Sequence, residues 1–112
     1  MSTGLIANLE KLLGSARDGA LLRYSLGSEY LKAGNRGRAI AELREALTRD
    51  AAYSAAWKLL GKALTEEGKP EEALQAFERG IEAAEAKGDR QAAKEMKVFA
   101  QRLRRQNAEP PD

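Results

Sequence analysis

The amino-acid sequence predicts an all-α protein built from stacked helix pairs, and three observations support this fold class. The 112 residues include 21 Ala and 15 Leu but only three Ile and one Val, and Ala and Leu favour helices whereas β-branched residues favour strands. The sequence repeats with an offset of 34 residues, which is the length of one helix–turn–helix unit. Apolar residues recur at spacings of three and four, which place them on one face of a helix.

The first expected element is a single helix over residues 5–16. Moving the apolar stripe of residues 39–47 back by 34 positions places it on five large apolar residues, which are Leu5, Ile6, Leu9, Leu12 and Leu13. The segment therefore matches the second helix of a pair and begins the stack as a half-repeat. Ser15 and Asp18 have the spacing of a capping box, which predicts the start of the next helix.

Two full repeats follow, over residues 20–53 and 54–87. Each carries a Leu-Gly pair in its first helix, and an Ala followed four residues later by a larger apolar residue in its second helix. The pattern consists of Leu26, Gly27, Tyr30, Ala39 and Leu43 in the first repeat, and of Trp57, Leu60, Gly61, Leu64, Ala73 and Phe77 in the second. Small residues at equivalent positions let paired helices approach closely, and the larger side chains fill the space around that contact.

A last helix is expected over residues 89–106, because Gly88 and Asp89 combine a helix stop with a helix cap. Its apolar stripe has spacings of four, three and four and consists of Ala92, Met96, Phe99 and Leu103. One face of this helix should cover the second repeat while the other stays charged. Residues 107–112 are expected to be a disordered tail. The sequence thus predicts one domain over residues 1–106, with six antiparallel helices.

The pattern resembles the tetratricopeptide repeat, of the kind found in small bacterial proteins. The repeat length, the Leu-Gly pair, the Ala of the second helix and the aromatic residue after it carry this resemblance. The chain departs from the family pattern at Arg23, where Trp is usual, at Gly80, where Ala is usual, and in lacking the closing Pro of both repeats. The resemblance implies an α-α superhelix, or solenoid, that serves as a non-catalytic scaffold for protein binding.

The resemblance also implies a binding groove on the concave face, lined by the first helix of each pair. The implied groove positions are Leu21, Tyr24, Ser28 and Leu31, then Ala55, Lys58, Lys62 and Thr65, and, with a shift of two residues in the last helix, Lys94, Val98 and Gln101. Lys58 and Lys62 are four residues apart and share one helical face, so they could converge on one anion. Our hypothesis is a groove for a peptide segment or partner helix, acidic in character, with Tyr24 and Leu31 giving apolar contacts. The alternative is that the two lysines only solubilise an exposed face and pair with nearby glutamates.

A second hypothesis is an assembly subunit that forms homo-oligomers or docks in a larger complex through its N-terminal helix. The five large apolar residues of that short helix are more than one contact face needs, and a leftover apolar patch invites a partner.

The residue types also exclude several classes of function. Cys and His are both absent, so thiolate and imidazole catalysis, disulfides and the usual zinc and iron–sulfur sites are excluded. We therefore expect no enzyme, no small-molecule substrate, no cofactor and no metal. The basic last helix lacks an aromatic stacking platform, so we do not expect a nucleic-acid partner. No apolar run approaches the ~20 residues that span a bilayer, and no signal peptide is evident, which predicts a cytoplasmic protein.

Overall fold

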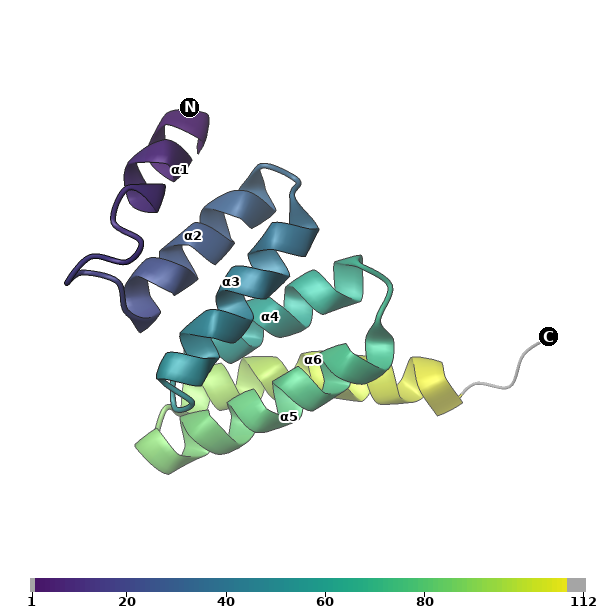
Figure 1. Cartoon of the computed structure of the whole chain (residues 1–112). Coiled ribbons are helices and arrows are strands. Elements are labelled where there is room, and N and C mark those ends of the chain that lie inside the picture. The colour runs from purple at the N-terminus through teal and green to yellow at the C-terminus, as the bar shows by residue number, and fades with distance from the viewer. Residues whose placement is uncertain (1, 109–112) are drawn as a thin grey trace.

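The computed structural model describes residues 2–108, and all regular secondary structure within this range is helical (Figure 1). The helices are α1 (Ser2–Glu10), α2 (Ala20–Lys32), α3 (Arg36–Arg49), α4 (Ser54–Glu66), α5 (Pro70–Lys87) and α6 (Arg90–Ala108). The predicted all-α helical-repeat fold is confirmed. The first repeat contains the pair α2–α3, and the second contains the pair α4–α5.

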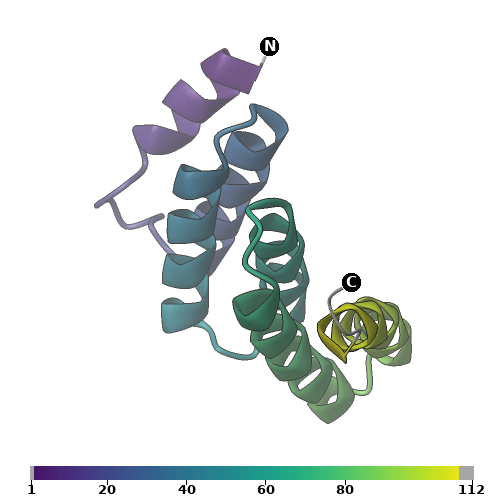
Figure 2. The ribbon, with the colours of Figure 1, turned by 90° about the vertical axis from the view of Figure 1, so that its right-hand side faces the viewer.

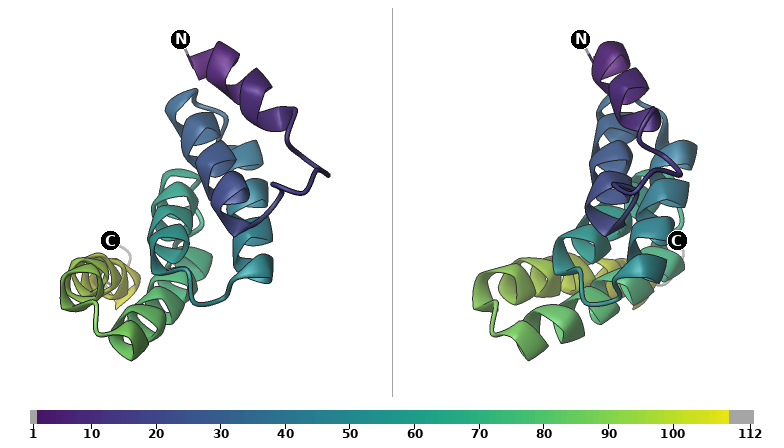
Figure 3. Two further views of the ribbon diagram at one scale, coloured as in Figure 1. Left: turned by 90° about the vertical axis from the view of Figure 1, so that its left-hand side faces the viewer. Right: turned by 60° about the vertical axis from the view of Figure 1, so that its left-hand side comes forward.

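The helix pairs stack into a curved array. The first helices of neighbouring units touch each other, α2 with α4 and α4 with α6, whereas α3 and α5 make no such contact. Figure 3 (left) shows α2, α4 and α6 in one row and α3 and α5 in another, and Figure 2 shows α6 almost end-on beside α5. Because the row of first helices is the closer packed, α2, α4 and α6 form the concave side of the stack.

Three glycines permit the closest helix contacts. A Cβ atom built on Gly27 would lie 2.7 Å from Cγ of Leu43, and one built on Gly61 would lie 2.6 Å from the Phe77 ring. At Gly80, a Cβ atom would collide with Met96 of α6. Real Cβ atoms do not approach other atoms this closely, so a larger residue at any of the three positions would displace these side chains or the helices that carry them.

The apolar interior falls into two clusters of unequal size. The larger extends from α3 to α6 and includes Phe77, which is fully buried and stacks on Phe99 with 5.2 Å between the ring centroids. The smaller consists of Leu22, Leu26, Tyr30 and Ala39, and it is covered by half-buried residues of α1 and the turns after it, namely Ile6, Leu9, Leu12 and Leu13. The N-terminal segment therefore packs on α2, as a half-repeat should.

A charged cluster ties these turns to the first repeat. The Arg23 guanidinium donates two hydrogen bonds to Asp18, at 2.9 and 3.0 Å, and a third to Glu42 of α3 at 2.9 Å. Arg23, together with the backbone N–H of Gly14, lowers the pKa of Asp18 to about 2. In addition, the Tyr30 hydroxyl donates a hydrogen bond to Glu10, and burial together with this bond raises the pKa of Tyr30 to about 12.

The N-terminal segment differs from its sequence prediction in two ways. The helix occupies Ser2–Glu10 instead of residues 5–16, because the backbone passes into tighter turns at Leu12 and Leu13. Gly14, whose φ of +80° is incompatible with a right-handed helix, then prevents any continuation to residue 16. Ser15 and Asp18 do not cap α2, so the predicted capping box is wrong. The Ser15 hydroxyl accepts from the N–H of Arg17, while Asp18 accepts from the N–H of Gly14, and both bonds lie in the turns before α2.

The C-terminal end also differs from the prediction. Residues 107 and 108 belong to α6, which continues to Ala108, so the helix is longer than the expected 89–106. The rest of the expected tail, residues 109–112, lies outside the described residues. The start of α6 matches the Gly88-Asp89 signal, since the Asp89 side chain accepts a hydrogen bond from the N–H of Ala92 at 3.1 Å.

Candidate functional site

Several of the predicted groove residues meet on the concave side of α2 and α4. A hollow of about 230 Å³ is lined by Tyr24, Ala55, Lys58, Leu59 and Lys62. The Tyr24 ring lies 5.0 Å from the ring of Tyr53, which fixes the aromatic wall of this hollow. The structure thus places Tyr24, Lys58 and Lys62 at one site.

The other predicted residues of α2 and α4 contribute less. Leu31 is half-buried and packs against both apolar clusters, so its main role is in the core. Ser28 is half-buried, while Leu21 is 69% exposed. The Thr65 hydroxyl donates to the carbonyl oxygen of Gly61 at 2.8 Å, one turn earlier in its own helix.

A second hollow of about 300 Å³ lies between α4 and α6, and Lys62 lines this one as well. Phe99 of α6 forms its apolar wall, with Phe77 of α5 stacked behind it. The Lys62 ammonium lies 5.4 Å, and the Arg102 guanidinium carbon 5.8 Å, from the centroid of the Phe99 ring. Within residues 2–108, neither cation has a carboxylate within 4 Å. The Glu66 side chain also lines the hollow and Lys62 contributes to the lowered pKa of Glu95, so the positive charge around the ring is partly balanced.

The Lys58 ammonium already has a carboxylate partner within the protein. Its ammonium donates to Glu95 of α6 at 2.5 Å, which joins α4 to α6 across the concave face. This hydrogen bond is the main reason why the pKa of Glu95 is lowered, and a second bond from Gln91 adds to the effect. The alternative in which a lysine pairs with a nearby glutamate therefore describes Lys58, whereas Lys62 makes no ion pair within 4 Å and acts on Glu95 only from a greater distance.

The structure does not bring Lys94 to this site. Lys94 lines a separate hollow at the turn between α5 and α6, beside Glu85 and Arg90. Gln101 lies between α5 and α6, near Glu78, and Val98 is 49% exposed. The groove positions predicted for the last helix with a shift of two residues therefore do not lie on the side of α6 that faces α4.

Sequence reasoning missed the residues of α6 that do face α4, namely Glu95, Phe99 and Arg102. Phe99 was assigned to the core stripe, and it does stack on Phe77, but its ring also lines the hollow. These three residues are spaced by four and three, so they share one helical face, and that spacing was the available signal.

The apolar patch expected on the N-terminal helix is mostly covered. Of its five residues, Leu5 alone is exposed, at 45%, while the other four are half-buried against the smaller cluster. Homo-oligomerisation through this helix stays a prediction.

The described residues offer neither a cluster of metal ligands nor a helix that could span a membrane. No group of three or more Asp or Glu side chains is placed to hold a metal ion. Within the described range, every helix is too short or too polar to cross a membrane. The cytoplasmic location expected from the sequence stays a prediction.

Comparison with known proteins decides the family. The family model described as "Tetratricopeptide repeat" matches residues 24–90, which is more than half of the chain. The chain belongs to the tetratricopeptide repeat family. Tetratricopeptide repeats generally mediate protein–protein interactions and are generally not catalytic.

The relatives include bacterial and fungal repeat proteins. The TPR repeat-containing protein PA0015 of Pseudomonas aeruginosa is 48% identical over 101 residues, which cover 90% of this chain and 96% of that protein. The solution structure of protein BPP2914 from Bordetella parapertussis is 42% identical with a TM-score of 0.79, over 93% of this chain and 90% of that one. The Sgt2 TPR domain from Aspergillus fumigatus is 27% identical with a TM-score of 0.81, over 99% of this chain and 75% of that one.

Proposed function

We propose that the protein binds a segment of a partner protein on the concave face, at the hollow between α4 and α6. The observation that carries the proposal is the arrangement of Lys62 and Arg102 around the ring of Phe99. Aromatic and arginine side chains are enriched where proteins bind one another, because they combine apolar area with a directed charge.

The chemistry of the hollow favours a segment with a large apolar side chain beside a carboxylate. Phe99, backed by Phe77, offers an apolar wall, while hydrogen bonds from ammonium and guanidinium groups to a carboxylate are among the stronger ones in proteins. Lys58 does not supply this charge, because Glu95 already neutralises it.

The pair between Lys58 and Glu95 has a second consequence for the site. It joins the two helices that form the walls of the hollow, so the backbone positions from which Lys62 and Arg102 extend are held together before any ligand arrives. A preformed site loses less conformational entropy on binding.

The proposal is tested by selection from a library of random peptides displayed on phage, followed by calorimetric titration of the enriched peptides. We expect enrichment of an acidic residue next to a large apolar one. The double variant Lys62→Glu and Arg102→Glu should bind at least about tenfold more weakly, since each hydrogen bond to a charged group contributes about 1.5–3 kcal/mol.

The matched control is the double variant Arg90→Glu and Lys94→Glu, which makes the same change of charge at exposed positions of α6 outside the hollow. Its affinity should equal that of the wild type. Equal losses in both double variants would show that only the overall charge matters, and enrichment of neutral or basic peptides would contradict the proposed chemistry.

A further inference from the structure

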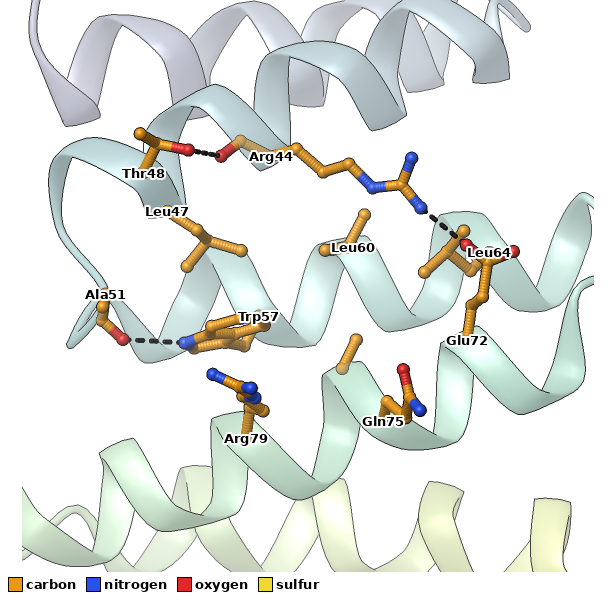
Figure 4. Close-up of a pocket in the computed structure, with 11 residues that line it drawn as sticks. Arg44, Leu47, Thr48, Ala51, Trp57, Leu60, Leu64, Glu72, Gln75 and Arg79 are labelled. Atoms are coloured by element: carbon orange, nitrogen blue, oxygen red, sulfur yellow. Dashed lines mark hydrogen bonds and ion pairs between the residues drawn. The ribbon is translucent and has the colours of Figure 1, made fainter.

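The convex side of the stack carries a larger hollow of about 420 Å³ between α3 and α5 (Figure 4). It exists because the stack bends toward its other side, so that the backbones of α3 and α5 diverge and side chains of α4 form the floor between them. We call it the outer trough, and its walls are α3 and α5 while its floor is α4.

The floor of the outer trough is apolar. Trp57, Leu60 and Leu64 of α4 contribute to it, together with Leu47 of α3. The three leucines are almost fully buried, and Trp57 is half-buried. The Trp57 indole N–H donates to the carbonyl oxygen of Ala51 at 2.8 Å (Figure 4), so the polar atom of the ring is satisfied and the ring offers apolar surface.

The rims of the outer trough carry one charge that is not balanced. Arg44 of α3 pairs with Glu72 of α5 at 2.9 Å, and this pair bridges the two walls. The Arg79 guanidinium points toward Trp57 in Figure 4, with its carbon 6.0 Å from the ring centroid. In the described part of the chain, Arg79 has no carboxylate within 4 Å.

We infer that the outer trough is a second binding surface, and that it takes a segment of a partner protein in which a large apolar side chain lies next to an acidic residue. The apolar side chain packs on Trp57 and the leucine floor, and the carboxylate pairs with Arg79. Charge complementarity selects this occupant, because the pair of Arg44 and Glu72 cancels and Arg79 leaves a net positive charge beside the aromatic ring. The inference does not rest on the proposed function, since the two hollows have no residue in common.

Binding at the outer trough can be followed by the intrinsic fluorescence of the protein. The chain contains one Trp, and it forms part of the trough floor. When the peptide contains no Trp, a change in fluorescence on binding therefore comes from Trp57 and reports on the outer trough directly.

The test uses the Lys62→Glu and Arg102→Glu double variant, in which the two cations of the hollow between α4 and α6 are replaced by carboxylates. Random dodecapeptides without Trp, displayed on phage, are selected on this variant, and the enriched peptides are then titrated while Trp57 fluorescence is recorded. We expect an acidic residue next to Phe, Leu or Ile in the enriched peptides, and a fluorescence change that saturates. Adding Arg79→Glu should weaken binding at least about tenfold, whereas adding Arg90→Glu, an equal change of charge elsewhere on the surface, should leave it unchanged.

Arg79 is exposed, so we expect the Arg79→Glu variant to fold, and its circular dichroism and melting curve verify this. Failure to enrich any peptide would overturn the inference, as would enriched peptides that leave Trp57 fluorescence unaltered or bind equally well after Arg79→Glu. None of these results would bear on the proposed binding at the hollow between α4 and α6, because the starting variant lacks the two cations of that hollow.

Discussion

At one equivalent position in their first helices, the two repeats carry side chains of different chemistry. In the second repeat this residue is Trp57, whose Cβ lies beside Gly80 and whose side chain lines the outer trough with leucines of α3 and α4. In the first repeat the equivalent residue is Arg23, which hydrogen-bonds to Asp18 and Glu42 instead. The fold thus requires a side chain here that connects its helix to the neighbouring segments, and either apolar packing or paired charges meet that requirement.

This difference divides the molecule into two parts with different sources of stability. The α4–α6 part belongs to a large apolar cluster that includes Phe77, while the α1–α2 part relies on a small cluster, a charged network and the bond from Tyr30 to Glu10. Apolar packing depends little on pH, whereas the paired charges depend on the protonation of Asp18. The N-terminal part should therefore be the less stable one and the more sensitive to acid.

The largest effect is expected from Phe77→Ala. Phe77 is fully buried, contacts the position of Gly61 and stacks on Phe99, so its removal should lower the free energy of unfolding by about 3–5 kcal/mol. Leu26→Ala, at a fully buried position of the smaller cluster, should cost about 2–5 kcal/mol, toward the lower end. Urea denaturation measures both, and a smaller loss for Phe77→Ala than for Leu26→Ala would contradict the division into two parts.

The second largest effect, a local loss of stability in the N-terminal part, is expected from Arg23→Ala. The substitution leaves Asp18 and Glu42 without their shared partner, so amide hydrogen exchange should accelerate in α1, α2 and the turns between them, while α5 and α6 keep their protection. Arg44→Ala removes an exposed ion pair and serves as the control. Uniform acceleration along the whole chain would show that the two parts unfold together.

A smaller effect is expected from acid. The pKa of Asp18 is about 2 in the folded protein, compared with the ordinary value of 3.8. Because the folded state binds this proton less readily than the unfolded state, the stabilisation is fully present above about pH 4 and is lost as the pH falls toward 2. Asp18→Asn should flatten the dependence of stability on pH between 4 and 2, as measured by denaturation at each pH. An unchanged slope would assign the acid sensitivity to other carboxylates.

The smallest effect is expected from Leu5→Glu. Leu5 is 45% exposed, so the free energy of unfolding should change by about 0.5 kcal/mol or less. Sedimentation of this variant and of the wild type should give the same mass at every concentration. A wild-type dimer that dissociates on this substitution would instead support assembly through α1.

Much of the fold follows from the offset of 34 residues. That offset aligns Gly27 with Gly61 and Leu43 with Phe77, and in the structure each glycine faces the Leu43 or Phe77 side chain of its partner helix. Composition gave the fold class for a similarly simple reason, since a chain so rich in Ala and Leu has few residues suited to strands.

The ends of the stack were harder to predict because they have no repeated counterpart. In α6, Met96 faces Gly80 of α5, a packing arrangement that an offset of 34 does not encode. As a result, Lys94 was placed at the groove and Arg102 was overlooked. The end of α1 was missed because the apolar stripe continues through Leu12 and Leu13 after the backbone has left the helix.

Interactions between residues far apart in sequence were also beyond prediction. Glu95 reaches Lys58 across 37 positions, and the pairing depends on how α6 lies against α4. Trp57 was interpreted as a core residue. The outer trough that exposes part of its ring results from the curvature of the stack, which no local pattern specifies.

The binding of a partner segment in the hollow between α4 and α6 can be observed residue by residue. The most direct test is chemical-shift mapping on the ¹⁵N-labelled wild-type protein, with a peptide selected on the Arg79→Glu variant so that the outer trough does not choose it. We expect the largest shifts at Lys62, Thr65, Phe99 and Arg102, with the outer surfaces of α3 and α5 unaffected. Shifts concentrated outside the concave side, or no saturable shifts at all, would contradict the account.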